Sequence, residues 1–100
     1  MKRDLLSDYL ANLLAVDTCP DSAPNGLQVA GRSTIKRLCT AVTASQEAIQ
    51  QAVDFHADAL LVHHGLFWKG DAAPIVGMKR ERLRALLVND INLFAYHLPL

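Results

Sequence analysis

Hydrophobic residues recur along this chain with two different spacings, and the change between them separates predicted helices from predicted strands. Leucine and tyrosine repeat every three or four residues over 3–15, which predicts an amphipathic helix. The same spacing predicts two further helices, at 46–55 and 78–89. Short apolar runs predict four strands, at 27–29, 35–42, 59–63 and 91–96.

The order of these segments predicts the sheet. Only the turn Gly31-Arg32-Ser33 separates the first two strands, and this close spacing predicts a β-hairpin. From residue 35 onward the long elements alternate β-α-β-α-β, which favours a parallel sheet with right-handed crossovers. We therefore expect one α/β domain over residues 1–100, with a mainly parallel sheet, helices packed against it and a short N-terminal hairpin.

Details of the two later helices can also be predicted. Thr43 and Ser45 are both good N-cap residues for the helix at 46–55, and Gln46 follows Thr43 at the spacing of a capping box. The apolar positions expected to be buried on that helix are Ala48, Ile49, Ala52, Val53 and Phe55. On the helix at 78–89 we expect Leu83, Leu86 and Leu87 to face inward. Its basic residues are expected to lie largely outward: Lys79, Arg80, Arg82 and Arg84.

Composition excludes several classes of protein. Half of the residues are hydrophobic (51%), which excludes a disordered chain. Ten basic residues balance ten acidic residues, so there is no nucleic-acid signature. No apolar run is long enough to span a membrane, and the N-terminus lacks the features of a signal peptide. Two isolated cysteines, Cys19 and Cys39, are then expected to be reduced thiols in a cytoplasmic protein.

The strand at 59–63 ends in the strongest candidate for chemistry. Four consecutive apolar residues predict a strand that is buried on both faces, and His63, His64 and Gly65 follow directly. His97 ends the last strand, so three histidines are expected at the carboxyl edge of one sheet, where α/β proteins bind ligands. Histidine is the commonest metal ligand, although strand-end histidines also simply hydrogen-bond to backbone. Neighbouring side chains on an ideal strand point to opposite faces, which suits two metal ions better than one.

Other residues carry weaker predictions. The long connection 65–77 contains Trp68 and Lys69, which could stack a base and meet a phosphate, but a loop tryptophan also suits a subunit contact. His56 follows a helix and is expected to be structural. Asn25-Gly26 is expected to form a turn, with a backbone approach to the site as the alternative. The basic residues of 79–84 are expected to be a solvated helix face rather than a phosphate patch.

Five stretches of the chain resemble the Nif-three-like family, also called GTP cyclohydrolase I type 2 homologues. They are Pro-Asn-Gly-Leu-Gln-Val at 24–29, Val-Thr-Ala-Ser at 42–45, Ala-Asp-Ala-Leu-Leu-Val-His-His-Gly at 57–65, Phe-Trp-Lys-Gly at 67–70 and Tyr-His-Leu-Pro-Leu at 96–100. Members of this family are two to three times longer, are often toroidal hexamers and carry a dinuclear metal centre. The resemblance implies that the chain corresponds to the N-terminal half of a larger Nif-three-like fold.

The resemblance also implies roles for individual residues. His63 and His64 would be ligands, one to each of two divalent ions, and the sequence does not distinguish zinc, iron, manganese and magnesium. The family's motif places His97 at the edge of the site, so we expect it to support the metal site or contact a substrate and not to be a ligand. Trp68 and Lys69 are candidates for the same supporting or substrate-binding role on their chemistry alone. The implied function is metal-dependent hydrolysis, with a purine nucleotide as the candidate substrate; the alternative is a non-enzymatic metal-binding scaffold. The family's remaining ligands, an aspartate after His-Leu-Pro-Leu and a later histidine and glutamate, have no counterpart here.

Two expectations follow for the chain as it stands. Because two histidines alone make an incomplete set of ligands, we expect weak or single metal occupancy, or none, and little activity. Half of a larger fold would leave apolar surface and a strand edge uncovered, so we expect a homo-oligomer, at least a dimer, with Trp68 as the candidate anchor.

Overall fold

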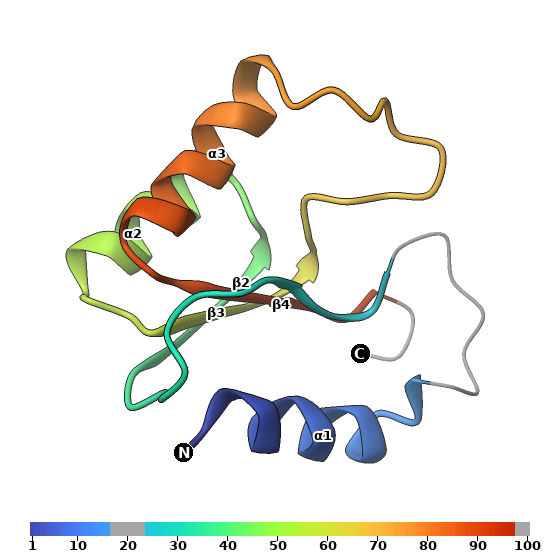
Figure 1. Cartoon of the computed structure of the whole chain (residues 1–100), viewed down its shortest axis with the longest axis vertical. Helices are drawn as coiled ribbons and strands as arrows, with labels where there is room; N and C mark the ends of the chain where they lie inside the picture. Colours follow the sequence, from blue (N-terminus) through green and yellow to red (C-terminus); the bar gives the residue numbers. More distant parts are fainter. Residues whose placement is uncertain (17–23, 98–100) are drawn as a thin grey trace.

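The computed structural model describes residues 1–16 and 24–97, which form seven regular elements (Figure 1). The helices are α1 (Arg3–Leu13), α2 (Gln46–Asp54) and α3 (Gly77–Val88). The strands are β1 (Gly26–Val29), β2 (Leu38–Thr43), β3 (Ala59–His64) and β4 (Asn92–Ala95). All three predicted helices and all four predicted strands are therefore present. No helix in the described part of the chain is long and apolar enough to cross a membrane.

The four strands form one mixed sheet in the order β1-β4-β3-β2. β2 and β4 both run parallel to β3, which confirms the parallel sheet predicted for the later part of the chain. β1 pairs with β4 in the antiparallel direction. The predicted N-terminal hairpin is therefore wrong, because β1 and β2 lie at opposite edges of the sheet. The second strand also begins at Leu38 rather than at residue 35.

Side chains from distant parts of the chain explain why no hairpin forms. The segment between β1 and β2 crosses the amino ends of the two inner strands. There, the buried Asn92 accepts a hydrogen bond from the Gly31 amide (2.6 Å) and donates one to the Arg32 carbonyl (2.8 Å). A Cβ on Gly31 would lie 2.3 Å from the Asp90 carbonyl oxygen, so only glycine permits this approach. These contacts carry the chain across the sheet instead of turning it back.

Asp58, just before β3, binds the later part of the segment between β1 and β2. Its carboxylate accepts hydrogen bonds from the backbone amides of Lys36 (2.8 Å) and Arg37 (2.9 Å) and forms an ion pair with Arg32 (2.6 Å). Burial raises the pKa of Asp58, but these hydrogen bonds and the guanidinium charge outweigh it and hold the pKa below its usual value. A buried charge is tolerated here because two backbone amides and a guanidinium group stabilise it.

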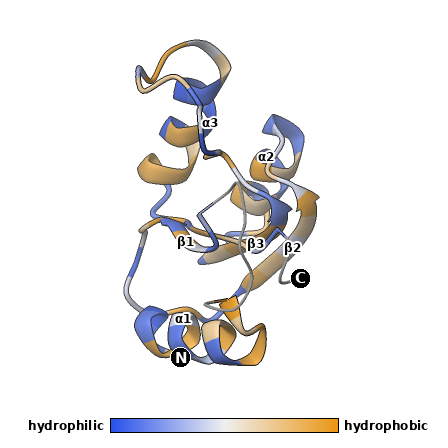
Figure 2. Cartoon of the chain, turned by 90° about the vertical axis from the view of Figure 1, so that its right-hand side faces the viewer, coloured by the Kyte–Doolittle hydropathy of each residue, from blue (hydrophilic) through white to orange (hydrophobic). Residues whose placement is uncertain are grey.

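Helices cover both faces of the sheet, with α1 on one side and α2 and α3 on the other (Figure 1). Two hydrophobic clusters result. The larger lies between the sheet and the α2–α3 layer and includes Ile49, Ala52, Leu83 and Leu86. The smaller lies under α1, where Leu6, Leu10 and Leu14 pack on Phe94 and Tyr96. Coloured by hydropathy, the three helices each carry both hydrophobic and hydrophilic residues, as two-sided elements must (Figure 2).

Two of the predicted inward positions are wrong. Phe55 is 52% exposed and Leu87 is 56% exposed. Phe55 occupies the C-cap position of α2, beyond the last residue that faces the sheet, and the Arg37 guanidinium lies 5.3 Å from its ring centroid. Leu87 follows the buried Leu86 directly, and one step of a helix turns a side chain away from its neighbour's face.

Both helices that lead into parallel strands end in the same way. His56 after α2 and Asp90 after α3 have positive φ angles of 58° and 52°. In each case the next amide bonds back across the turn: Ala57 to the Ala52 carbonyl, and Ile91 to the Leu86 carbonyl. This is the Schellman motif, in which glycine usually takes the left-handed position. The structural role predicted for His56 is consistent with this placement.

Candidate metal centre

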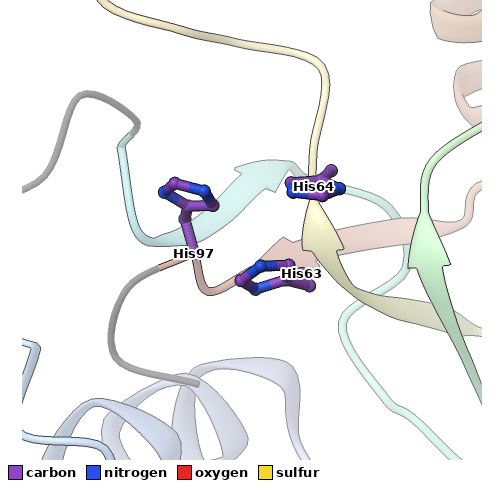
Figure 3. A group of neighbouring side chains, drawn as sticks. All are labelled: His63, His64 and His97. Carbon is purple, nitrogen blue, oxygen red and sulfur yellow. The ribbon is translucent and has the colours of Figure 1, made fainter.

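Three histidines meet at the carboxyl edge of the two inner strands (Figure 3). His63 and His64 end β3, and His97 lies just beyond β4, which runs parallel to it. One ring nitrogen from each of the three residues lies within 4.8 Å of the others. The sequence-based prediction that these histidines share one edge of the sheet is therefore confirmed. All three are partly buried, so each histidine keeps some contact with solvent.

The neighbouring residues His63 and His64 do not diverge as an ideal strand would require. Their ring centroids are 4.4 Å apart, and His97 lies 4.9 Å from His63 and 5.5 Å from His64. β3 ends at His64 and the backbone leaves the strand at Gly65, so the regular alternation of side chains is lost at this point. The structure therefore brings all three imidazoles to one place, including the adjacent pair that strand geometry alone would separate.

Hydrogen bonds orient the two rings on β3. His63 Nδ1 lies 3.2 Å from the Tyr96 carbonyl oxygen, which can only accept, so Nδ1 is the donor in this hydrogen bond and Nε2 is the ring nitrogen available to a metal ion. His64 Nδ1 lies 3.2 Å from the Thr43 hydroxyl, at the end of β2. Metal-binding histidines commonly use their second nitrogen in this way. Ser45 rather than Thr43 caps α2, accepting a hydrogen bond from the Ala48 amide, so the predicted capping box is wrong and Thr43 serves the site.

The third histidine is held by a residue just before β1, the outer strand that pairs with β4. The Asn25 side chain accepts a hydrogen bond from the His97 amide (2.8 Å), just before β1 begins at Gly26. Gly26 has a φ of 123°, which favours glycine. The turn predicted at Asn25-Gly26 is therefore wrong, because Gly26 begins β1, and the Asn25 side chain instead fixes the backbone of a site residue.

Gln28 and Gly65 hold the loop that follows the histidines. The Gln28 side chain accepts a hydrogen bond from the Leu66 amide (2.9 Å) and donates one to the Pro24 carbonyl (3.0 Å). A Cβ on Gly65 would lie 2.1 Å from Gln28 Oε1 and 2.7 Å from Ala95 Cβ. Only glycine therefore lets the chain leave β3 this close to β1 and β4.

Trp68 forms a wall of the histidine cluster, whereas Lys69 does not. The Trp68 ring stands edge-on to His97, with centroids 4.9 Å apart, and lies 5.9 Å from His64. Lys69 is exposed on the loop.

Of the basic residues on α3, Arg80 and Arg84 are exposed, as a solvated helix face requires, whereas Lys79 and Arg82 are partly buried. The segments 17–23 and 98–100, with Cys19 and the final Leu-Pro-Leu, lie outside the described residues.

The fold and the site together define a class: an α/β protein with a mixed four-stranded sheet and a histidine cluster at the carboxyl edge of its inner strands. The sequence model of the Duf34/NIF3 (NGG1p interacting factor 3) family matches residues 1–100. The chain therefore belongs to the DUF34/NIF3 family.

Similar proteins agree with this assignment. The chain is 51% identical over 100 residues to a Salmonella typhimurium protein named "GTP cyclohydrolase 1 type 2 homolog" and 55% identical over 95 residues to the Haemophilus influenzae protein of the same name. It covers 40% and 38% of those two proteins, and 100% and 95% of its own length is matched. The chain thus spans about two fifths of the length of these relatives.

Solved structures share the same fold. The protein ybgI, described as of unknown function, superposes with a TM-score of 0.98 at 51% identity, over 100% of this chain and 40% of that one. TTHA1606 from Thermus thermophilus superposes with a TM-score of 0.93 at 41% identity, over 99% of this chain and 41% of that one. HcgD from Methanocaldococcus jannaschii has a TM-score of 0.88 at 28% identity, with 100% and 41% covered.

Proposed function

We propose that this chain binds a divalent metal ion through His63 and His64, with His97 as a third nitrogen donor. The observation that supports this most directly is the convergence of three imidazole nitrogens within 4.8 Å of one another. Ligands about 2.1 Å from a tetrahedral zinc ion lie about 3.4 Å apart, so small side-chain rotations would suffice. The free Nε2 of His63 is the atom that would bind, since Nδ1 faces the Tyr96 carbonyl.

The residues around the histidines support the same proposal. The Tyr96 carbonyl and the Thr43 hydroxyl restrict the two rings of β3, and Asn25 fixes the backbone that carries His97. Trp68 covers one side of the cluster and limits the access of water. A divalent ion bound here would act as a Lewis acid and lower the pKa of a bound water.

Metal titration tests the proposal. We expect Co²⁺ to bind the metal-free chain at one ion per chain with the visible absorption of a nitrogen-ligated site. His63→Ala and His64→Ala should each lower the affinity by about 100-fold or more, beyond the 10- to 100-fold typical of residues that only orient a ligand. His97→Ala should also change the absorption spectrum, because it removes the third nitrogen ligand. His56→Ala is the matched control and should leave binding unchanged. Equal binding by all four variants would contradict the proposal.

We further propose metal-dependent hydrolysis, with a purine nucleotide as the candidate substrate, as the activity of the complete site. The name carried by the curated relatives supports the reaction class. The competing candidate is a non-enzymatic metal-binding scaffold, and one observation favours it: among residues 1–16 and 24–97, the cluster consists of histidines and includes no carboxylate to serve as a general base. The chain alone is accordingly expected to bind metal without measurable turnover.

We also propose that the chain self-associates. Large apolar side chains are exposed on α3 and just before it, including Val76 (68%), Met78 (67%) and Val88 (71%). Such a surface seldom stays bare on a monomer. Light scattering at micromolar concentration should show a dimer or larger species that Val88→Lys weakens. Trp68→Ala should leave association unchanged, because Trp68 lies against the histidines. A monomeric wild-type chain would refute the proposal.

A further inference from the structure

A cavity of about 430 Å³ lies beside the histidine cluster, between the loop after β3 and the start of α3. Its wall includes Gly65 and Trp68 on the loop side and Lys79 and Arg82 on the helix side. Trp68 also contacts His64 and His97, so it borders both the cavity and the proposed metal site. The volume is that of a small-molecule site.

Positive charge dominates the wall of this cavity. Lys79 and Arg82 lie one turn apart on α3, whereas Asp71 is the single acidic residue among those that line it. The Asp71 carboxylate already accepts a hydrogen bond from the Trp68 amide (3.0 Å). The Lys79 ammonium lies 4.5 Å from the centroid of the Phe67 ring, a cation–π contact that holds it beside the loop.

Arg82 has an unused donor. Its Nε atom is buried and has no hydrogen-bond partner among the described residues. Buried donors on charged groups are nearly always paired, and the Arg82 side chain lines this cavity, so a rotation of the side chain would let Nε donate to an anion bound there. The planar guanidinium is suited to the oxygens of a phosphate or carboxylate.

The start of α3 adds a third feature that attracts anions. Val76, the N-cap residue, lines the cavity and provides no side-chain cap. The first amides of a helix have no partner within the helix, and the helix dipole places partial positive charge at this end. Two cationic side chains, an unpaired guanidinium nitrogen and an uncapped helix terminus thus meet at one cavity.

We propose that this cavity binds the phosphate groups of a small phosphorylated ligand whose other end reaches the histidine cluster past Trp68. The position of that other end rests on the function proposed above. The binding of phosphate itself does not, because it is argued from Lys79 and Arg82 on α3 and not from the histidines. The basic residues of α3 therefore divide into Lys79 and Arg82, which bind the ligand, and Arg80 and Arg84, which lie outside this cavity.

Trp68 makes a direct test possible, since it is the chain's single tryptophan and lines the cavity. The metal-free chain at pH 8 would be titrated with inorganic pyrophosphate while tryptophan fluorescence is followed, and calorimetry would confirm the affinity. We expect saturable binding that Lys79→Gln/Arg82→Gln weakens at least tenfold. The matched control is Arg84→Gln, which removes the same charge from the same helix and should change affinity less than twofold.

The histidine variants separate this proposal from the metal proposal. His63→Ala/His64→Ala should lose Co²⁺ binding and keep pyrophosphate binding. Loss of pyrophosphate binding in that variant, with retention in Lys79→Gln/Arg82→Gln, would place the anion on the histidines and overturn the inference. Absence of saturable binding, or equal weakening by Arg84→Gln, would also overturn it. If the double variant does not fold by circular dichroism, Lys79→Gln alone decides, with at least a threefold loss expected.

Discussion

Replacing Asp58 with alanine is expected to lower the free energy of unfolding by about 2–3 kcal/mol, mainly the cost of leaving two backbone donors without their acceptor, because the Arg32 side chain is 45% exposed and its ion pair adds little. The substitution leaves the Lys36 and Arg37 amides without their acceptor and the Arg32 guanidinium without its counter-charge. It would therefore release the segment that crosses from β1 to β2. Because small domains are stable by about 5–15 kcal/mol in total, urea denaturation should show a large fall in the midpoint.

The same carboxylate gives the loss a pH dependence. The pKa of Asp58 is lower in the folded chain than in the unfolded chain, so its contribution is fully present above about pH 4 and is lost as the pH falls through the folded value. Wild type and Asp58→Ala should thus approach each other in stability in strong acid. Asp54→Ala is the control, since that exposed residue accepts a hydrogen bond from Gln50 of its own helix and has no other partner among residues 1–16 and 24–97. If Asp54→Ala lost as much stability as Asp58→Ala, the special role of Asp58 would be contradicted.

Gly65→Ala should affect both the fold and the metal site, with a loss of stability of about 3 kcal/mol. The new methyl group would lie 2.7 Å from Ala95 Cβ, which is fixed to β4 and cannot rotate away. It would also displace the Gln28 side chain and break its hydrogen bond to the Leu66 amide. His64 precedes this position, so we expect the affinity for Co²⁺ to fall at least tenfold as the ring moves.

A second substitution separates the two clashes at Gly65. Gln28→Ala removes the closer contact, with Gln28 Oε1 at 2.1 Å, but leaves the contact with Ala95. The double variant Gln28→Ala/Gly65→Ala should therefore be no more stable than Gly65→Ala. Recovery of wild-type stability in the double variant would show that glycine is required at position 65 only to make room for the Gln28 side chain. Denaturation and metal titration on the same samples would measure both effects.

The inner part of the fold could be predicted because it follows local rules. Alternating strands and helices demand parallel pairing, and parallel strands bring their carboxyl ends to one edge, so the meeting of His63 and His97 followed from element order. The hairpin could not be excluded in this way. It fails because Asn92 and Asp58 bind the segment at 31–37 from far along the chain, and no local periodicity reports such contacts.

The supporting side chains of the site could not be predicted from the sequence for the same reason. Asn25, Gln28 and Thr43 act on residues 21 to 72 positions away. Their presence within the stretches at 24–29 and 42–45 was the available signal, but it did not indicate which atoms they would bind. Apolar residues on α1 come in adjacent pairs, such as Leu5-Leu6 and Tyr9-Leu10. The pattern alone could not show which member of each pair faces the sheet. In the structure Leu6 and Leu10 face it, while Leu5 and Tyr9 face solvent.

The strand order has a consequence for how the chain must fold. β4 is the last of the four strands to be synthesised, yet it lies inside the sheet, between β3 and β1. Gly26 pairs with Ala95, so β1 has no partner within this sheet until synthesis has passed Ala95. Until then the edges of β1 and β3 are open, and contacts of such long sequence separation form slowly. The nascent chain is therefore most exposed to wrong pairing in the interval before β4 leaves the ribosome.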